Sequence, residues 1–182
     1  MLTVGQKLPE FSVVAVKPGF NHHEENGESA FETITDKSFA GKWKIIFFYP
    51  KDFTFVCPTE IVEFAKLNGE FADRDAVVLG GSTDNEFVKL AWRREHKDLY
   101  QLNQYSFADT QGQLTDGLGV RDVSAGVALR ATFIVDPENI IQHVSVNGLN
   151  VGRNPQEILR ILDALQTDEL CPCNRPVGGE TL

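Results

Sequence analysis

The stretch that decides the fold is YPKDFTFVCPTE, residues 49–60. The run Trp43–Phe48 precedes it, and its many aromatic and β-branched side chains predict a buried strand. After the stretch, residues 61–72 place apolar side chains at helical spacing. The segment is therefore predicted to form a strand, a loop and a helix in succession.

The end of this loop has the composition of a helix start. Cys57 takes the N-cap position, where serine or threonine is usual, with Pro58 at the first helical position and Glu60 at the third. A sulfur there faces the unpaired N–H groups of the first turn and the positive end of the helix dipole. Both favour a thiolate over a thiol, so the sequence predicts that Cys57 is reactive.

The remainder of the loop suits a thiolate that attacks a small molecule. Pro50 has no N–H and can exclude water, while the Thr54 hydroxyl can donate and accept hydrogen bonds. Cleavage of an O–O bond needs a nucleophile for one oxygen and donors that stabilise charge on the other. The loop offers both, but it holds no fixed cation to stabilise the charge.

The loop resembles that of a known family. Pro50, Thr54 and Cys57 fit the Pro-x-x-x-Thr-x-x-Cys signature of peroxiredoxins. The longer run through Glu60 is similar to the alkyl hydroperoxide reductase C-type subgroup of typical two-cysteine peroxiredoxins. This resemblance, which spans nearly the whole chain, implies that Cys57 is the peroxidatic cysteine and that Thr54 and Pro50 shape its pocket.

The resemblance also implies a source for the cation, namely Arg130 in the run LRATFIVDP, residues 129–137. Without the resemblance, an arginine inside a strand is more often a surface residue or one half of an ion pair. Glu60 is expected to orient Arg130 through an ion pair, although a role as a capping residue in the first helical turn would also explain its position.

Composition bounds the protein class. With 182 residues, 42% of them hydrophobic, the chain can bury one full core. The net charge of -9 opposes binding to nucleic acid or to anionic membrane surfaces, and the pair Arg93 and Arg94 is expected to lie on a solvated helix face. No apolar run is long enough to span a membrane and no signal peptide is evident, so we expect a cytoplasmic protein.

Three cysteines in such a chain point to reactive thiols or to a metal, rather than to a framework of disulfides. The metal alternative is weak. Cys171 and Cys173 are separated by one residue, which is not the usual spacing in structural zinc sites, and His22 and His23 have no third ligand nearby. We expect neither a metal nor a cofactor.

The order of elements predicts an α/β fold. Residues 18–28 read as a surface loop, Trp92 as a packing residue and His96 as a surface residue rather than a catalytic base. Parallel strand–helix units are followed by a hairpin of two strands and a closing helix. The predicted strands are 11–16, 31–35, 43–49, 76–81, 106–110, 129–135 and 140–146, and the predicted helices are 57–72, 85–96, 111–118 and 154–165.

These elements suggest a three-layer sandwich similar to the thioredoxin fold, with an N-terminal extension, over residues 1–166. Residues 167–182 have little apolar content, two prolines and a glycine pair, and are expected to form a mobile tail. A mobile thiol suits an oxidised cysteine, because a second thiol converts sulfenic acid to a disulfide.

The resemblance implies that Cys171 is this resolving cysteine and that it reacts with Cys57 of a partner subunit. Cys173 departs from the commoner pattern and is similar to a three-cysteine subgroup that carries Cys-Pro-Cys. Two roles for Cys173 remain open, a share in resolution or transfer of the disulfide to a reductant.

The resulting hypothesis is a thiol-dependent peroxidase that reduces hydrogen peroxide and organic hydroperoxides in antioxidant defence. The resemblance implies recycling by an external dithiol, either thioredoxin or a dedicated disulfide reductase, and a homodimer that assembles into a ring. One alternative is a thioredoxin-like disulfide reductase, which the absence of Cys-x-x-Cys at Cys57 disfavours. The other is a redox-sensing or chaperone-like oligomer.

Overall fold

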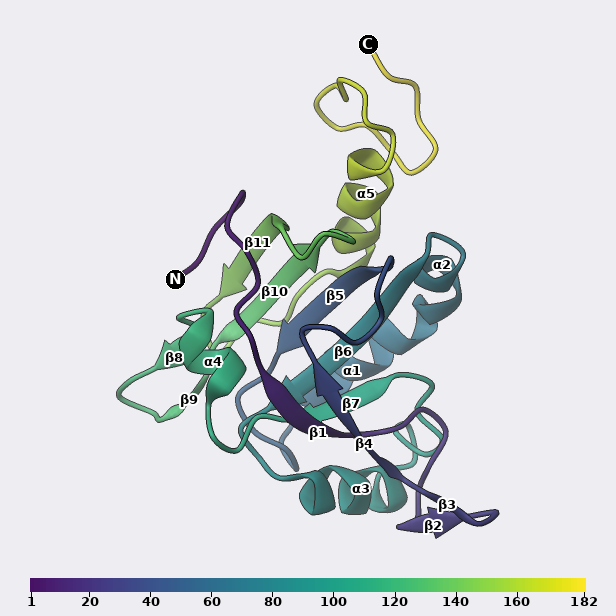
Figure 1. Ribbon diagram of the computed structural model, residues 1–182, viewed down its shortest axis with the longest axis vertical. Helices are drawn as coiled ribbons and strands as arrows, with labels where there is room; N and C mark the ends of the chain where they lie inside the picture. Colours follow the sequence, from purple (N-terminus) through teal and green to yellow (C-terminus); the bar gives the residue numbers. More distant parts are fainter.

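The computed structural model describes residues 1–182 and is built around one seven-stranded sheet (Figure 1). The strand order is β11-β10-β5-β6-β7-β1-β4, in which β5, β6 and β7 run parallel and the outer pairs are antiparallel. The strands are β1 (Ser12–Val16), β4 (Phe31–Thr35), β5 (Trp43–Phe48), β6 (Ala76–Ser82), β7 (Tyr105–Ala108), β10 (Arg130–Val135) and β11 (Ile141–Asn147).

Helices lie on both faces of this sheet, which confirms the predicted three-layer, thioredoxin-like architecture. Alternation along β5 divides the core, since Ile45 and Phe47 pack against α1, α2 and α5 while Ile46 and Phe48 pack with α4 and the N-terminal segment. The helices are α1 (Cys57–Lys66), α2 (Asn68–Ala72), α3 (Glu86–Glu95), α4 (Gln113–Gly117) and α5 (Pro155–Leu165). None of them is both long and apolar enough to cross a membrane.

The first helix differs in two ways from its prediction. It begins at Cys57 itself, because Val56 occupies the N-cap position with helical backbone angles and no side-chain cap. The predicted N-cap role of Cys57 is therefore wrong, and Glu60 lies one position beyond the site of a capping-box glutamate. The helical region also breaks after Lys66, so that residues 68–72 form the separate helix α2.

Two short hairpins were not predicted. The first, β2 (Glu24–Glu25) with β3 (Glu28–Ser29), lies, except for Ser29, within residues 18–28, which were predicted to form a surface loop. The second, β8 (Arg121–Asp122) with β9 (Val127–Ala128), lies just before β10. Each strand has only two residues, which is too short for a periodic pattern to be recognised in the sequence.

The prediction that Arg93 lies on a solvated helix face is wrong. Its side chain is 1% exposed and donates to the backbone oxygens of Lys17 and Gln104 and to the hydroxyl of Ser106. Burial lowers the pKa of Arg93 to about 10, which leaves it charged at neutral pH. Arg94 is exposed as predicted, and Trp92 is buried in the core as predicted.

The packing of β6 against β5 predicts a stability effect at Gly80. A Cβ there would overlap the ring of Phe47, which cannot retreat because it stacks on Phe64 with ring centroids 4.1 Å apart. We expect Gly80→Ala to lower the free energy of unfolding by about 1–3 kcal/mol, the usual cost of overpacking. Urea unfolding followed by circular dichroism measures this.

The matched control is Gly69→Ala in α2, where an added Cβ meets no atom within 4 Å. Alanine there should raise stability by about 0.5–1 kcal/mol through its better helix propensity. Equal stabilities for the two variants would contradict the packing argument.

Candidate active site

Cys57 lies where the loop after β5 enters α1, at the carboxyl end of the parallel strands. Its side chain is 0% exposed and packs in the apolar cluster that includes Tyr49 and Ile61. In the first turn of α1, the N–H groups of Thr59 and Glu60 are already bonded to the Val56 carbonyl. The sulfur must therefore find its strongest polar partner outside its own helix.

That partner is Arg130, at the start of β10. Its Nη1 lies 3.4 Å from Cys57 Sγ and donates to Glu60 Oε2 at 2.7 Å, while its Nε donates to the backbone oxygen of Leu149 at 2.6 Å. Three acceptors thus fix the guanidinium plane. The structure brings together the predicted cysteine, arginine and glutamate, and Glu60 forms the ion pair predicted as one of its two possible roles.

A second arginine, Arg153, was not anticipated from the sequence. It lies just before α5 and reaches Glu60 through both oxygens, with Nε to Oε1 and Nη2 to Oε2 at 2.8 Å each. Its Nη1 donates to the Ala131 carbonyl at 2.8 Å, and its guanidinium lies over the Phe47 ring. No local pattern marks Arg153, because its partners come from distant parts of the chain.

The charges of this buried group do not balance without the cysteine. Arg130 and Arg153 carry two positive charges, and Glu60 supplies one negative charge. An uncompensated charge is expensive in a buried space. The group therefore presents its excess positive charge to Cys57, whose Sγ lies 3.4 Å from Arg130 Nη1.

A cavity of about 330 Å³ opens above this group. Pro50, Thr54 and Val56 form one wall, and Arg130 joins the cavity to the buried sulfur. The Thr54 hydroxyl donates to the backbone oxygen of Lys51 at 2.8 Å, so its lone pairs are what it presents to a bound molecule. Pro50 and Thr54 both line this cavity, and of the two hydrogen-bonding roles expected for the Thr54 hydroxyl, donation is directed to the loop itself.

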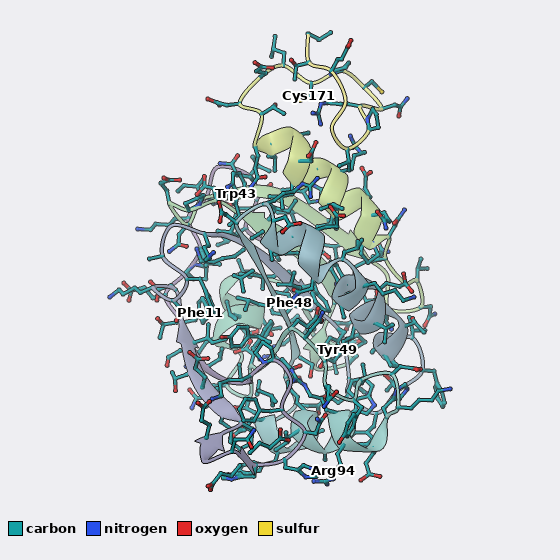
Figure 2. All side chains as sticks on the ribbon, turned by 90° about the vertical axis from the view of Figure 1, so that its right-hand side faces the viewer. Phe11, Trp43, Phe48, Tyr49, Arg94 and Cys171 are labelled. Carbon is teal, nitrogen blue, oxygen red and sulfur yellow. The ribbon has the colours of Figure 1, made fainter.

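The two tail cysteines lie away from this cavity. Figure 2 shows Cys171 beyond the end of α5, at the opposite end of the molecule from α3, whereas Tyr49 lies near the middle. Cys171 Sγ lies 3.4 Å from Thr167 Oγ1 and 3.6 Å from the Ala164 carbonyl oxygen, and Cys173 is exposed. All three cysteines are unpaired, and within one chain Cys57 and Cys171 are not in contact.

Residues 167–182 contain no helix or strand, but side-chain contacts attach them to α5. Arg175 is buried and donates to Asp163 Oδ2 at 2.7 Å, and the same oxygen accepts from the N–H of Gly178 at 2.9 Å. Arg160 also donates to the carbonyl of Arg175. The mobility of this tail remains a prediction, and its release requires the loss of these bonds.

The histidines take no part in the site. His96 accepts a hydrogen bond from the N–H of Asp98 and packs its ring against the edge of Trp92. His22 and His23 are exposed, and His23 packs against the rings of Phe31 and Phe87. The non-catalytic role of His96 stays a prediction.

Comparison with known proteins gives a consistent result. The AhpC/TSA family matches residues 4–144. The chain belongs to this family.

The sequence is 52% identical to alkyl hydroperoxide reductase C of Mycolicibacterium smegmatis, in an alignment that covers 100% of this chain and 94% of the relative. It is 39% identical to a peroxiredoxin of Schizosaccharomyces pombe, with coverage of 100% and 93%. Among solved structures, Mycobacterium tuberculosis AhpC matches with a TM-score of 0.87 at 48% identity, over 96% of this chain and 98% of that one.

These matches confirm the resemblance to peroxiredoxins of the alkyl hydroperoxide reductase C type, and with it the thioredoxin-like fold. The family match begins near the N-terminus and ends in β11, so that it contains Cys57, Glu60 and Arg130. Arg153 and the two tail cysteines lie beyond it.

The dual pairing of Glu60 leads to a prediction for Arg153. We expect Arg153→Met to lower the free energy of unfolding by about 1–3 kcal/mol, because Glu60 and the Ala131 carbonyl lose buried charged hydrogen-bond donors. Arg94→Met is the matched control, because the Arg94–Glu95 pair is exposed and 3.5 Å long. Its loss should change stability by about 0–1 kcal/mol, and similar values for both variants would contradict this reading of the site.

The attachment of the tail should depend on Asp163 and on pH. Burial raises the pKa of Asp163, but the hydrogen bonds from Arg175, Gly178 and Arg74 outweigh it, so that the pKa lies below its ordinary value of 3.8. A carboxylate whose pKa falls on folding stabilises the attached tail at pH above 3.8, and this stabilisation is lost as the pH falls through the lowered pKa.

At neutral pH, Asp163→Asn should release the tail and speed its cleavage by proteinase K after residue 166, measured by mass spectrometry. Asp168→Asn is the control, since Asp168 is exposed at the base of the tail. Cleavage of the Asp163→Asn tail at the native rate would show that these bonds do not hold it.

Proposed function

We propose that this protein is a thiol-dependent peroxidase that reduces hydrogen peroxide and organic hydroperoxides. The observation that carries the proposal is the contact between Arg130 Nη1 and Cys57 Sγ at 3.4 Å, beside a cavity large enough for a small hydroperoxide. Membership of the AhpC/TSA family supports the same activity.

In the first step, the Cys57 thiolate attacks one oxygen of the peroxide and the O–O bond breaks. Cys57 becomes a sulfenic acid, and the second oxygen leaves as hydroxide or alkoxide and takes a proton from solvent to give water or an alcohol, so that sulfur loses two electrons and the peroxide gains them. Arg130 donates to the oxygen on which charge develops. Thr54 accepts a hydrogen bond from the peroxide O–H and so orients the peroxide toward the sulfur. Pro50 limits access of water.

Glu60 acts through Arg130. The carboxylate is held by Arg130 on one side and Arg153 on the other, so it fixes the guanidinium that faces the sulfur. It does not reach the reacting atoms itself, and we assign it a positioning role together with Arg153.

In the second step, the thiol of Cys171 from a partner subunit attacks the Cys57 sulfenic acid, which forms a disulfide and releases water. Within one chain the start of α1, which carries Cys57, lies apart from the tail beyond α5, which carries Cys171 (Figure 1), and this favours an intersubunit disulfide and hence a homodimer. We include in the proposal assembly of the dimers into a ring. An external dithiol, thioredoxin or a dedicated disulfide reductase, then takes up the disulfide and restores both thiols.

Cys173 is the most accessible of the three sulfurs and stands two residues from Cys171. It is therefore placed to exchange with the Cys57–Cys171 disulfide and pass it to the reductant. This assignment is separate from the peroxidase step, because it requires no contact with the peroxide.

The test is steady-state consumption of hydrogen peroxide and of cumene hydroperoxide with dithiothreitol, comparing the unmodified chain with Cys57→Ser, Cys171→Ser and Cys173→Ser. Cys57→Ser should abolish turnover, because it removes the nucleophile. On a non-reducing gel, the oxidised chain should run as a disulfide-linked dimer that is absent in Cys171→Ser and present in Cys173→Ser.

Catalytic consumption by Cys57→Ser would contradict the proposed site and direct attention to the tail. A single stoichiometric reaction that stops despite excess dithiothreitol would instead indicate the redox-sensor alternative.

A further inference from the structure

A second buried ion pair lies beneath the loop over Cys57. Lys89, on α3, places Nζ 3.1 Å from Oδ1 and 3.3 Å from Oδ2 of Asp52, and both side chains are 1% exposed. Neither residue was singled out in the sequence, where a lysine on a polar helix is expected to face solvent. Burial of two opposite charges is costly unless hydrogen bonds also satisfy their remaining donors and acceptors.

The surrounding groups satisfy those donors and acceptors. Ser82 Oγ donates to Asp52 Oδ1 at 2.7 Å, and Lys89 Nζ donates to Ser82 Oγ at 2.8 Å and to the Tyr49 hydroxyl at 3.2 Å. The N–H of Asp52 donates to Asp84 Oδ2 at 2.8 Å. The network therefore ties the loop to the end of β5, the end of β6 and helix α3.

Little else holds this loop. Asp52 is the only buried residue between Pro50 and Val56. Phe53 is half exposed, with a left-handed φ of 56° that is unfavourable for a phenylalanine, and Phe55 is 93% exposed. Apart from the stacking of Phe53 on Trp92, the attachment of the loop rests on the polar network of Asp52.

The same loop carries the cavity wall. Pro50 and Thr54 stand two residues before and after Asp52, and both line the cavity beside Cys57. A disulfide also requires two sulfurs to approach to about 2.05 Å, which a fully buried Cys57 cannot allow while the loop stays closed. The state of the loop thus affects the first chemical step and the second in opposite directions.

We propose that the Asp52–Lys89 ion pair is the anchor that holds loop 50–56 closed over Cys57. The strength of this ion pair sets the balance between two reactions, that of Cys57 with peroxide and that of the oxidised Cys57 with a second thiol. Both are positioning residues, because neither touches the reacting atoms. The consequence for the two chemical steps rests on the proposed peroxidase function, whereas the consequence for access to Cys57 does not.

Removal of one charge should open the loop. Lys89→Met leaves the Asp52 carboxylate buried without its cation, so the closed state is destabilised. The double variant Asp52→Asn/Lys89→Met removes both charges and should lie nearer to the unmodified chain, since a neutral pair carries no buried unpaired charge. A purely steric role for Lys89 would give no such rescue.

The first measurement is the rate of alkylation of Cys57 by iodoacetamide in a Cys171→Ser/Cys173→Ser background, where Cys57 is the only thiol. Lys89→Met should raise this rate by about tenfold or more, since breaking a buried ion pair is strongly unfavourable. The double variant should show a smaller increase.

The second measurement separates the two steps in the unmodified tail by stopped-flow fluorescence. Trp92 stacks on Phe53 with ring centroids 5.7 Å apart and reports on the loop, and a Trp43→Phe background leaves it as the only tryptophan. Lys89→Met should lower the second-order rate constant for oxidation by hydrogen peroxide and raise the rate constant for disulfide formation. A smaller fraction of Cys57 should then reach the sulfinic acid at high peroxide, as measured by mass spectrometry.

Arg93→Met is the matched control. Arg93 is a buried cation one turn further along α3, but its donors go to the segments around β1 and β7 rather than to the loop. It should lower overall stability and leave the alkylation rate and both rate constants unchanged.

An unchanged alkylation rate in Lys89→Met, or an equal increase in Arg93→Met, would overturn the proposal. If the unmodified chain does not react with peroxide, the proposed function fails, and the alkylation rates still decide whether the ion pair anchors the loop.

Discussion

The structure depends on one buried interaction, the ion pairs that Arg130 and Arg153 form with Glu60. Arg130 comes from β10, Arg153 from the segment before α5, and Glu60 from the first turn of α1, so that three parts of the fold meet at one carboxylate. Such a cluster is stable only if its charges and hydrogen bonds are satisfied. Its excess positive charge lies against Cys57, so the residues that hold these three parts of the fold together also supply the cation beside the sulfur.

Around this cluster, the loop after β5 divides its residues between structure and chemistry. Pro50 and Thr54 face the cavity, while Asp52 between them points to the opposite side and pairs with Lys89. The Glu60 cluster and the Asp52–Lys89 ion pair thus lie on two sides of Cys57. The Glu60 cluster fixes the cation beside the sulfur, and the Asp52 pair fixes the wall of the cavity that a peroxide would enter. A loop with exposed aromatic side chains can stay closed on this basis without a large apolar contact of its own.

The tail, residues 167–182, is attached to the rest of the protein in a different way. It carries two of the three cysteines, has no regular structure, and is attached to α5 through the partly exposed Asp163 rather than through a buried apolar surface. The proposed second step needs the tail to leave α5, and this release would break the Asp163 bonds while the sheet and its helices stay intact.

The sequence by itself determined the chemistry of the loop and the order of most elements. Pro50, Thr54 and Cys57 could be identified from their spacing within one loop. The strands and helices of the main sheet follow from periodic patterns within short windows. Apart from the ion pair between Arg130 and Glu60, which was expected, the burial of charged residues became visible only in the folded chain. Arg130 and Arg153 meet Glu60 across separations of 70 and 93 residues, and Lys89 meets Asp52 across 37. Such partners leave no local signal, because the favourable energy of each pair exists only once the fold has removed water from between them.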